Sequence, residues 1–448
     1  MKGTTVPNPE LHIFTERAHL RNPAITVLMK LSVDGKFDEL RFEAALQALK
    51  SVHPLLYSTV QIADDGKAYY RENAVSQLEA HCMKREHNDQ WLEVARVENK
   101  RHFNTASEPL VRFFVFYDEK DFDILAVAHH MVGDGDAIAR LIRDVVKAYA
   151  HISMPFQKQR LISNLDDFPE TAKPTFIVKA FTRNLNKTWG KGDMPRFDEQ
   201  EYEEMFKNYH RIADIGLSYS TISASQMDSL HQACKAHSIT INEAIITAFF
   251  SAMCEHCTYR INEEMVIGIP INIRNQLPFS VDSSLGNFAS AITIKHKGNT
   301  SNDFWQNANQ VRDKIKSKLT SAKASWVNLN LYAMMEPTLI DAIYFAAYGK
   351  CTDKAARKAA AMLGVSDNPS TTAVSNLGRL DFSSQISSYH IRDMVFFAPK
   401  APASYIVLGV ATLDNKMQIG YSYDQNYLSS DCMERISIRL EEILNTIR

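Results

Sequence analysis

Short hydrophobic runs and helical repeats alternate along the first half of the chain. Apolar runs that begin at Ala24, Pro109 and Asp121 have the length of buried strands. Over residues 37–49 and again over residues 138–149, apolar side chains recur near helical spacing. The first half is therefore predicted to form a sheet with helices packed against it.

The second half repeats the same kinds of element. Strand-like runs begin at Ile212 and Met265, and strand-rich sequence fills most of residues 371–424. Ser223 or Ser225 is a candidate N-cap for the helix that follows the first of these strands. Helices are predicted over residues 223–237, 241–256, 302–319, 339–363 and 430–447.

Between residues 184 and 210 the hydrophobic pattern weakens, and glycine, proline and charged residues become frequent. This composition predicts a crossover linker, 184–210, between an N-terminal domain, 1–183, and a C-terminal domain, 211–448. Strands and helices are mixed in both domains, so the predicted class is α/β or α+β. The chain has 448 residues, of which 45% are hydrophobic, so each domain can bury a core of its own.

Acidic and basic residues nearly balance, and the formal net charge is −2. This balance gives no electrostatic reason to expect a nucleic acid or an anionic membrane as partner, and Lys354 and Lys358 form no dense basic block. The longest strongly apolar stretch begins at Ala244 and is too short to span a bilayer. The N-terminal sequence lacks an apolar leader and the six cysteines are thinly spread, which favours a cytoplasmic location with reduced thiols.

Cys254 and Cys257 form a C-x-x-C pair with His256 between them. A single pair of this kind supplies only two of the four ligands that a structural zinc site needs. The surrounding sequence is also typical of a buried helix. These thiols are therefore interpreted as small side chains of the core.

The sequence AVAHHMVGDGDAIARL, which begins at Ala126, places two histidines where a predicted strand ends and a helix begins. Adjacent strand residues point to opposite faces, so one of His129 and His130 should face a cavity while the other is packed inside. Asp134 precedes the helix, where a carboxylate caps the first turn or is favoured by the helix dipole. Gly135 permits a tight turn.

Three interpretations fit this stretch. The first is a structural turn with a capping aspartate and two polar histidines. The second is a metal site, but the opposite faces of His129 and His130 count against a shared ion and no third ligand is evident. The third is a general base, in which one cavity-facing imidazole accepts a proton near pH 7.

The letters HHMVGDG also fit the H-H-x-x-x-D-G motif of the CoA- and carrier-protein-dependent acyltransferases. That superfamily includes chloramphenicol acetyltransferase-like enzymes, condensation domains of nonribosomal peptide synthetases, and plant and alcohol acyltransferases. Further segments resemble the same superfamily, namely LQALKSVHPLL, ITINEAIITAFF, IPINIRNQLPFSVDSSLGNF and VSNLGRLDF. The resemblance covers nearly the whole chain. The sequence contains neither the D-F-G-W-G motif of the plant members nor an attached carrier or adenylation domain, which favours a free-standing enzyme.

This resemblance implies two chloramphenicol acetyltransferase-like domains, each a mixed sheet with packed helices, and an active-site tunnel at their interface. It implies an acyltransferase in which the second histidine, His130, is the general base. The acyl group would pass directly from a thioester to an alcohol or amine while both substrates are bound. The expected co-substrate is a thioester of CoA or of a carrier protein's phosphopantetheine, and neither a bound cofactor nor a metal is expected.

The resemblance also assigns roles to other residues. Asp134 is expected to point away from the cavity and to pair with Arg274, since separating such a pair would leave a buried charge. Gly135 is expected to let the turn pack closely, and strand alternation predicts that His129 is packed rather than catalytic. Candidates to line the tunnel are Ser375, Asn376 and Asn287.

Two rival functions stay open within this interpretation. One is a condensation-type enzyme that uses only carrier-bound substrates, and the other is a catalytically silent homologue that binds a partner or ligand. A metal hydrolase that uses His129, His130 and Asp134 is a third rival, which sensitivity to chelators would support. The expected partners are a small-molecule acceptor and acyl-CoA or an acyl carrier protein. A monomer is expected, because one chain can supply both faces of the site.

Overall fold

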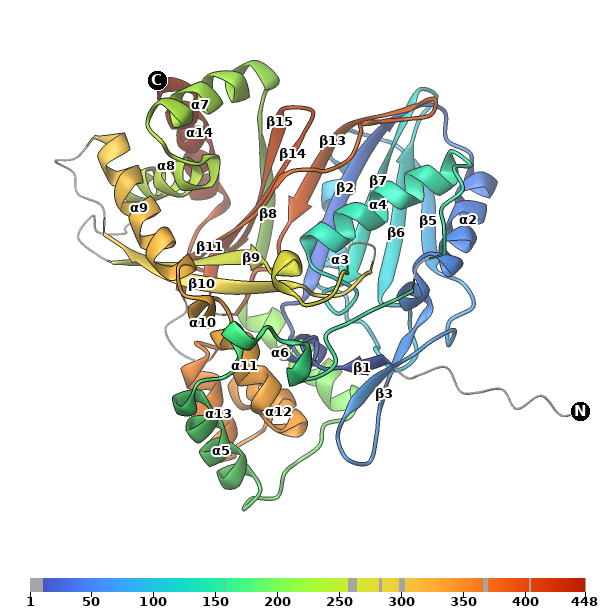
Figure 1. Cartoon of the computed structure of the whole chain (residues 1–448). Coiled ribbons are helices and arrows are strands. Elements are labelled where there is room, and N and C mark those ends of the chain that lie inside the picture. Colours follow the sequence, from blue (N-terminus) through green and yellow to red (C-terminus); the bar gives the residue numbers. More distant parts are fainter. Residues whose placement is uncertain are drawn as a thin grey trace, which may run out of the picture.

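The structure is a computed structural model that describes residues 11–156, 158–256, 264–281, 284–297, 303–365, 370–402 and 404–447. Two six-stranded sheets lie beside each other, each covered by helices, and a lobe of further helices projects below them (Figure 1). The predicted class, mixed sheets with helices packed on them in both halves of the chain, is confirmed.

The first sheet carries the strand that leads to the two histidines. Its order is β12 (Gln385–Ile386), β13 (Tyr389–Phe397), β2 (Thr26–Asp34), β7 (Asp121–His129), β6 (Val111–Tyr117) and β5 (Glu79–Lys84). All neighbours are antiparallel except β5 and β6. Helices α2 (Glu39–Ala48) and α4 (Gly135–Tyr149) contribute to the apolar cluster on one face, and α3 (Gln90–Glu98) to the cluster on the other. Burial on both faces explains why β2 and β7 are almost continuously apolar.

The second sheet is built from the C-terminal half. Its order is β10 (Ala289–His296), β9 (Met265–Asn272), β11 (Ser370–Arg379), β14 (Ser404–Leu413), β15 (Lys416–Asp424) and β8 (Ile215–Ile222). Strand β11 is parallel to both β9 and β14, and the other pairs are antiparallel. Its apolar cluster includes side chains of α7 (Ala224–Ala236), α8 (Ile241–His256), α9 (Phe304–Leu319) and α14 (Ser430–Thr446).

Two strands from the C-terminal half, β12 and β13, complete the first sheet. Strand β13 pairs antiparallel with β2, and the chain then returns to the second sheet as β14. The crossing is close, because an added Cβ at Gly409 or Gly420 would lie 2.3 Å from the carbonyl oxygen of Phe396. The glycines of β14 and β15 therefore let the backbone of β13 pass directly against the second sheet.

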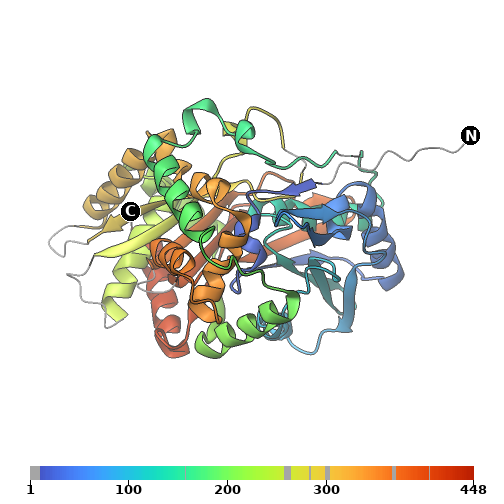
Figure 2. The ribbon, with the colours of Figure 1, turned by 90° about the horizontal axis from the view of Figure 1, so that it is seen from below.

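A helical lobe lies beneath the junction of the two halves (Figure 2). It contains α5 (Phe176–Trp189), α6 (Glu199–Ile212), α11 (Val327–Met334), α12 (Pro337–Tyr348) and α13 (Lys354–Met362) around a third apolar cluster. The stretch 184–210, predicted to be a linker, thus holds the end of α5 and most of α6, whose Leu185, Trp189 and Tyr202 are buried. The domain bounds at 183 and 211 stay a prediction.

The remaining elements are short. The predicted helix 339–363 is divided into α12 and α13 around Gly349, which follows the last residue of α12. A small third sheet has the order β1 (Leu11–Ile13), β4 (Ala68–Arg71) and β3 (Thr59–Ile62). The short helices are α1 (Arg17–Leu20), α10 (Ala322–Ser325) and the 3₁₀ turns Leu49–Ser51, Pro54–Tyr57, Leu165–Asp167, Glu170–Ala172 and Arg274–Gln276.

Candidate active site

The turn between β7 and α4 is held by backbone contacts with both halves of the molecule. The backbone N–H of His130 donates to the carbonyl of Ile25 at 3.1 Å, and the N–H of Asp134 donates to that of Gly286 at 3.3 Å. An added Cβ at Gly135 would lie 2.8 Å from the Phe396 ring. Only a glycine therefore allows the start of α4 to approach β13 this closely.

A cavity of about 280 Å³ lies where the two halves meet. Its walls come from the N-terminal segment around His19, the β7–α4 turn, strands β9 and β11, and the connection from β13 to β14. Among the residues singled out from the sequence, the cavity is lined by His130, Asp134, Gly135, Arg274, Ser375 and Asn376. Most of the remaining wall is apolar, which suits a site that must bind an organic substrate and exclude water.

His129 and His130 face in different directions, as strand alternation requires. His129 is fully buried, its Nδ1 accepts a hydrogen bond from the Met131 N–H at 3.3 Å, and its ring meets the edge of Phe103. Burial and the neighbouring His130 lower the pKa of His129 to about 3. His129 is therefore a neutral, packed side chain, and it does not line the cavity.

His130 is half-buried and lines the cavity. Burial lowers the pKa of its ring, although the charge of Asp134 opposes that effect. Its Nδ1 is buried without a hydrogen-bond partner among the described residues. The imidazole is therefore neutral at pH 7, which is the state that a proton acceptor needs.

Asp134 is bound by Arg274 and by two backbone N–H groups rather than by the histidines. Its Oδ1 accepts hydrogen bonds from Arg274 Nη2 at 2.9 Å and from the Ala137 N–H at 3.0 Å, while Oδ2 accepts one from the Phe288 N–H at 2.8 Å. Burial raises the Asp134 pKa, but the Arg274 charge and these hydrogen bonds outweigh it and lower the pKa overall. The carboxylate thus ties α4 to the second half of the chain.

A second imidazole, which no sequence pattern singled out, lies against His130. The His19 ring stacks on the His130 ring with centroids 4.3 Å apart and planes 16° apart. The Asn287 amide donates to His19 Nε2 at 2.8 Å, so Asn287 supports His19 and is not among the cavity-lining residues. His19 belongs to a four-residue helix, α1, which is too short to show an apolar period.

Glu16 completes this buried group. It is fully buried, and its Oε1 accepts a hydrogen bond from the Asn287 N–H at 3.2 Å. Burial raises the pKa of Glu16 to about 7, against the opposing effect of its hydrogen bonds. Glu16, Asn287 and His19 therefore form a chain of contacts that ends on the His130 ring.

The described part of the chain contains no group of three His, Cys, Asp or Glu side chains arranged to hold a metal ion. Cys254 is half-buried in α8, and burial raises the pKa of its thiol to about 11, whereas Cys257 lies outside the described residues. Within the same described ranges, no helix combines the length and the hydropathy needed to cross a membrane. The cytoplasmic location stays a prediction.

Comparison with known proteins identifies the fold. Residues 14–171 match the model of the condensation domain family. The chain is 21% identical over 315 residues to the vanchrobactin synthetase VabF of Vibrio anguillarum, an alignment that covers 65% of this chain and 10% of that protein. The chain spans a tenth or less of the length of the curated relatives it matches.

Solved structures extend the likeness to the whole chain. The trichothecene 15-O-acetyltransferase TRI3 of Fusarium sporotrichioides superposes with a TM-score of 0.66 and 10% identity, covering 97% of this chain and 95% of TRI3. The epimerization domain of tyrocidine synthetase B superposes with a TM-score of 0.61 and 14% identity, covering 98% and 97%. The chain therefore has the fold that these epimerization-domain and acetyltransferase structures share, and its residues 14–171 match the condensation domain family.

Proposed function

We propose that this protein is an acyltransferase that moves an acyl group from a thioester to a hydroxyl or amine, with His130 as the general base. The observation that carries the proposal is the His130 ring, which is neutral and lines a cavity to which both halves of the chain contribute. Two substrates can approach such a cavity from different sides and meet at one imidazole. This arrangement supports direct transfer within a complex of enzyme, donor and acceptor.

The proposed reaction needs no acyl-enzyme. His130 takes the proton from the acceptor O–H or N–H as that atom attacks the thioester carbonyl carbon. The tetrahedral intermediate then collapses, the carbon–sulfur bond breaks, and His130 returns its proton to the leaving thiolate. A positioned base of this kind contributes about 10²–10⁴ in rate.

The other site residues have supporting roles in the proposal. Asp134 and Arg274 hold the β7–α4 turn, and Gly135 lets that turn pack against β13. Ser375 and Asn376 line the cavity from β11, a strand of the second sheet, where they would contact the bound substrates. Because a thioester carbonyl gains negative charge during attack, a hydroxyl such as that of Ser375 is a suitable donor.

A condensation-type enzyme is the second candidate, and the family match over residues 14–171 favours it. In that case the same base would act on donors attached to a carrier protein instead of CoA. We include a monomer in the proposal, because the cavity is built from one chain. The acceptor is proposed to be a small molecule in either case.

The direct test is thiol release from acyl-CoAs of increasing chain length, measured with mixed alcohols, with mixed amines, and without acceptor. A parallel series supplies the same acyl groups on a phosphopantetheine-bearing carrier protein. Acceptor-dependent release from CoA supports the acyltransferase, whereas release only from the carrier supports the condensation-type enzyme. If neither donor releases thiol, the silent binding homologue replaces both.

The pH profile provides a further prediction. The neutral form of His130 is the active form, and its pKa lies below the usual value of 6.5. The value of kcat/KM should therefore be flat at neutral pH and should fall about tenfold for each pH unit below that pKa. A profile that falls with a midpoint above pH 7 would contradict a buried neutral base.

A further inference from the structure

Basic side chains from two helices that are distant in sequence meet on the helical lobe. On α5 and just after it, Lys179, Arg183, Lys187 and Lys191 are all exposed. The spacing of the first three is i, i+4 and i+8, so they form one stripe along the helix. On α13, the exposed basic side chains are Lys354, Arg357 and Lys358. These seven residues are called the basic lobe surface.

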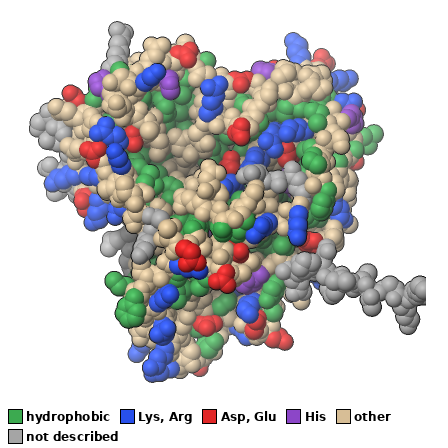
Figure 3. All heavy atoms as spheres, viewed as in Figure 1, with side chains coloured by type: hydrophobic (Ala, Val, Ile, Leu, Met, Phe, Trp, Pro, Cys, Tyr) green, Lys and Arg blue, Asp and Glu red, His purple; other side chains and the backbone are tan. Residues whose placement is uncertain are grey.

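The two halves of this surface are continuous. The Lys358 ammonium lies 5.5 Å from the centroid of the Phe181 ring of α5. At the other end, Asp353, which caps α13, lies against Gly192, three residues beyond the last residue of α5. The helices therefore run antiparallel side by side, and Figure 3 shows the lysines and arginines gathered on the lobe at the bottom of the molecule.

Acidic groups do not neutralise the basic lobe surface. Among the described residues, none of its seven side chains forms an ion pair with a carboxylate. Asp353 is the acidic residue nearest to this surface in sequence. Its Oδ1 accepts hydrogen bonds from the N–H groups of Ala355 and Ala356 at 2.7 and 3.1 Å. The net charge of −2 for the whole chain thus does not describe this surface, where seven exposed basic side chains lie on two neighbouring helices.

Two large apolar side chains project beside this surface. Phe176 is 82% exposed and Ile177 is 78% exposed, the highest values for large apolar side chains in the described part of the chain. Phe176 precedes Arg183 by seven residues and Lys187 by eleven, so it lies on the same stripe of α5. The inner face of α5, with Leu185 and Trp189, is buried.

We infer that the basic lobe surface, with Phe176 and Ile177, docks on the surface of an anionic lipid bilayer. Basic residues beside protruding apolar side chains are the features by which an amphipathic helix binds at a lipid interface. In this arrangement the two apolar side chains enter the headgroup region, while the lysines and arginines contact lipid phosphates. The helix lies on the membrane and does not cross it, which agrees with the absence of a spanning helix in the described ranges.

The shape of the lobe favours a membrane over a protein or nucleic-acid partner. The lobe projects below both sheets (Figure 1), and the side chains of Phe176 and Ile177 are more than three-quarters exposed and do not belong to its apolar cluster. A deformable lipid layer accepts protruding side chains, whereas a folded partner needs matching pockets. Of the two side chains only Phe176 has an aromatic face that can stack on a base, whereas both can enter a lipid layer.

The experiment is sedimentation of the full chain with vesicles of phosphatidylcholine alone or with one third phosphatidylglycerol. The wild type should bind only the anionic vesicles, and added salt should weaken the binding. The variant K179E/R183E/K187E should lose at least about a hundredfold in partition coefficient, because each basic residue at an anionic surface favours binding severalfold. The variant F176S/I177S should also lose binding at unchanged charge.

The matched control is K314E/K316E/K318E, which makes the same change in charge on α9, in the other half of the molecule. This control should bind like the wild type, and circular dichroism should show that all three variants fold. The inference is overturned if the wild type ignores anionic vesicles, which would favour an acidic protein partner. It is also overturned if the α9 control loses as much binding as the α5 variant. The vesicle assay does not depend on acyltransferase activity, so the two proposals can fail separately.

Discussion

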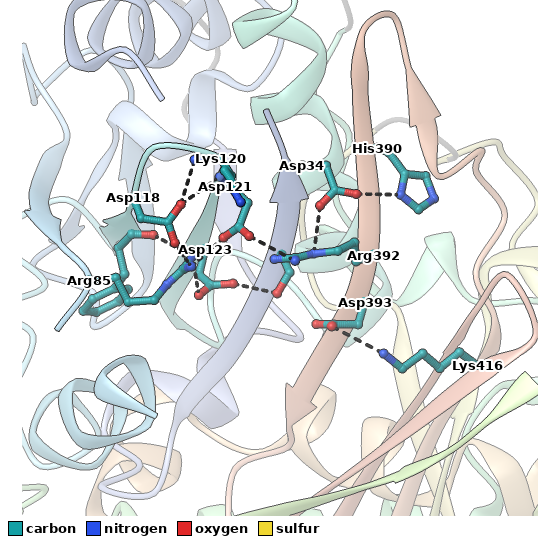
Figure 4. Close-up of polar contacts among 12 residues, drawn as sticks. Asp34, Arg85, Asp118, Lys120, Asp121, Asp123, His390, Arg392, Asp393 and Lys416 are labelled. Carbon is teal, nitrogen blue, oxygen red and sulfur yellow. Dashed lines mark hydrogen bonds and ion pairs between the residues drawn. The ribbon is translucent and has the colours of Figure 1, made fainter. Parts of the chain in front are cut away.

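The two ends of the paired strands β2 and β7 differ in their polar residues: one end carries ion-paired charges, and the other carries a neutral histidine. At the outer end, β7 begins with Asp121 and β2 ends with Asp34, and the register places these residues opposite each other. Arg392 bridges them at 3.1 Å to each carboxylate (Figure 4). Arg85 contacts Asp118 at 2.8 Å and Asp123 at 3.0 Å. Each of these carboxylates therefore has a basic partner.

At the inner end of the same strands, His130 follows β7 and its Nδ1 has no hydrogen-bond partner among the described residues. The His130 ring is held by stacking on His19 and is kept neutral by burial. Charges that are paired cannot easily exchange protons, whereas a neutral ring in a cavity can. The comparison shows how one strand pair can be stabilised at one end and kept reactive at the other.

The largest effect on folding is expected for Asp134→Asn, which leaves Arg274 buried without its main counter-charge. The free energy of unfolding should fall by about 3–5 kcal/mol, measured by urea denaturation at pH 7. Because the folded-state pKa of Asp134 is lowered, this stability is present above the unfolded value of 3.8 and is lost as pH falls through the folded value. A wild type and variant of equal stability at pH 7 would contradict the assigned pairing.

A smaller effect, on catalysis, is expected for His19→Ala. Without the stacked ring, His130 can rotate, and misplacement of a base lowers kcat by roughly tenfold to a hundredfold. His19→Phe retains a ring for stacking and should retain most of the activity, and both variants should show KM values close to wild type. If His19→Phe is as impaired as His19→Ala, the hydrogen bond from Asn287, and not the stack, positions the base.

The smallest effect is expected at the outer end, for Asp34→Asn. The Asp34 side chain is 45% exposed and its partner Arg392 is 38% exposed, so solvent screens the pair. The loss of stability should be about 0.5 kcal/mol and should shrink further at high salt. Activity should equal that of the wild type, and a measurable loss of activity would show that the two ends are coupled.

The sequence predicted those parts of the fold whose apolar periods are long. Strands β2, β6 and β7 and helix α4 lie where the patterns placed them, because each buries a continuous or regularly spaced apolar face. Helix α6 does carry an apolar period, with Tyr202, Met205, Phe206 and Tyr209 buried at helical spacing. The prediction of a linker over 184–210 missed it, because the glycine, proline and charged residues of that stretch were given more weight. The pairing of β13 with β2 in the first sheet depends on contacts between distant parts of the chain, so no local pattern predicts it.

The site residues that could be predicted are those that belong to a short sequence motif. His130, Asp134 and Gly135 share one turn, and the resemblance to a known motif added Arg274. The stacked His19 and its support from Asn287 and Glu16 depend on contacts between residues up to 271 positions apart. No local pattern marks such contacts, and they become visible only once the two halves are folded together.

The most direct measurement is acceptor-dependent thiol release by the wild type and by His130→Ala, with Asp34→Asn as the control from the opposite end of the strands. The account predicts that His130→Ala loses at least about a hundredfold in kcat while its stability and its affinity for the thioester change little. Asp34→Asn should match the wild type. Acceptor-dependent release that survives in His130→Ala would contradict the assignment of His130 as the base.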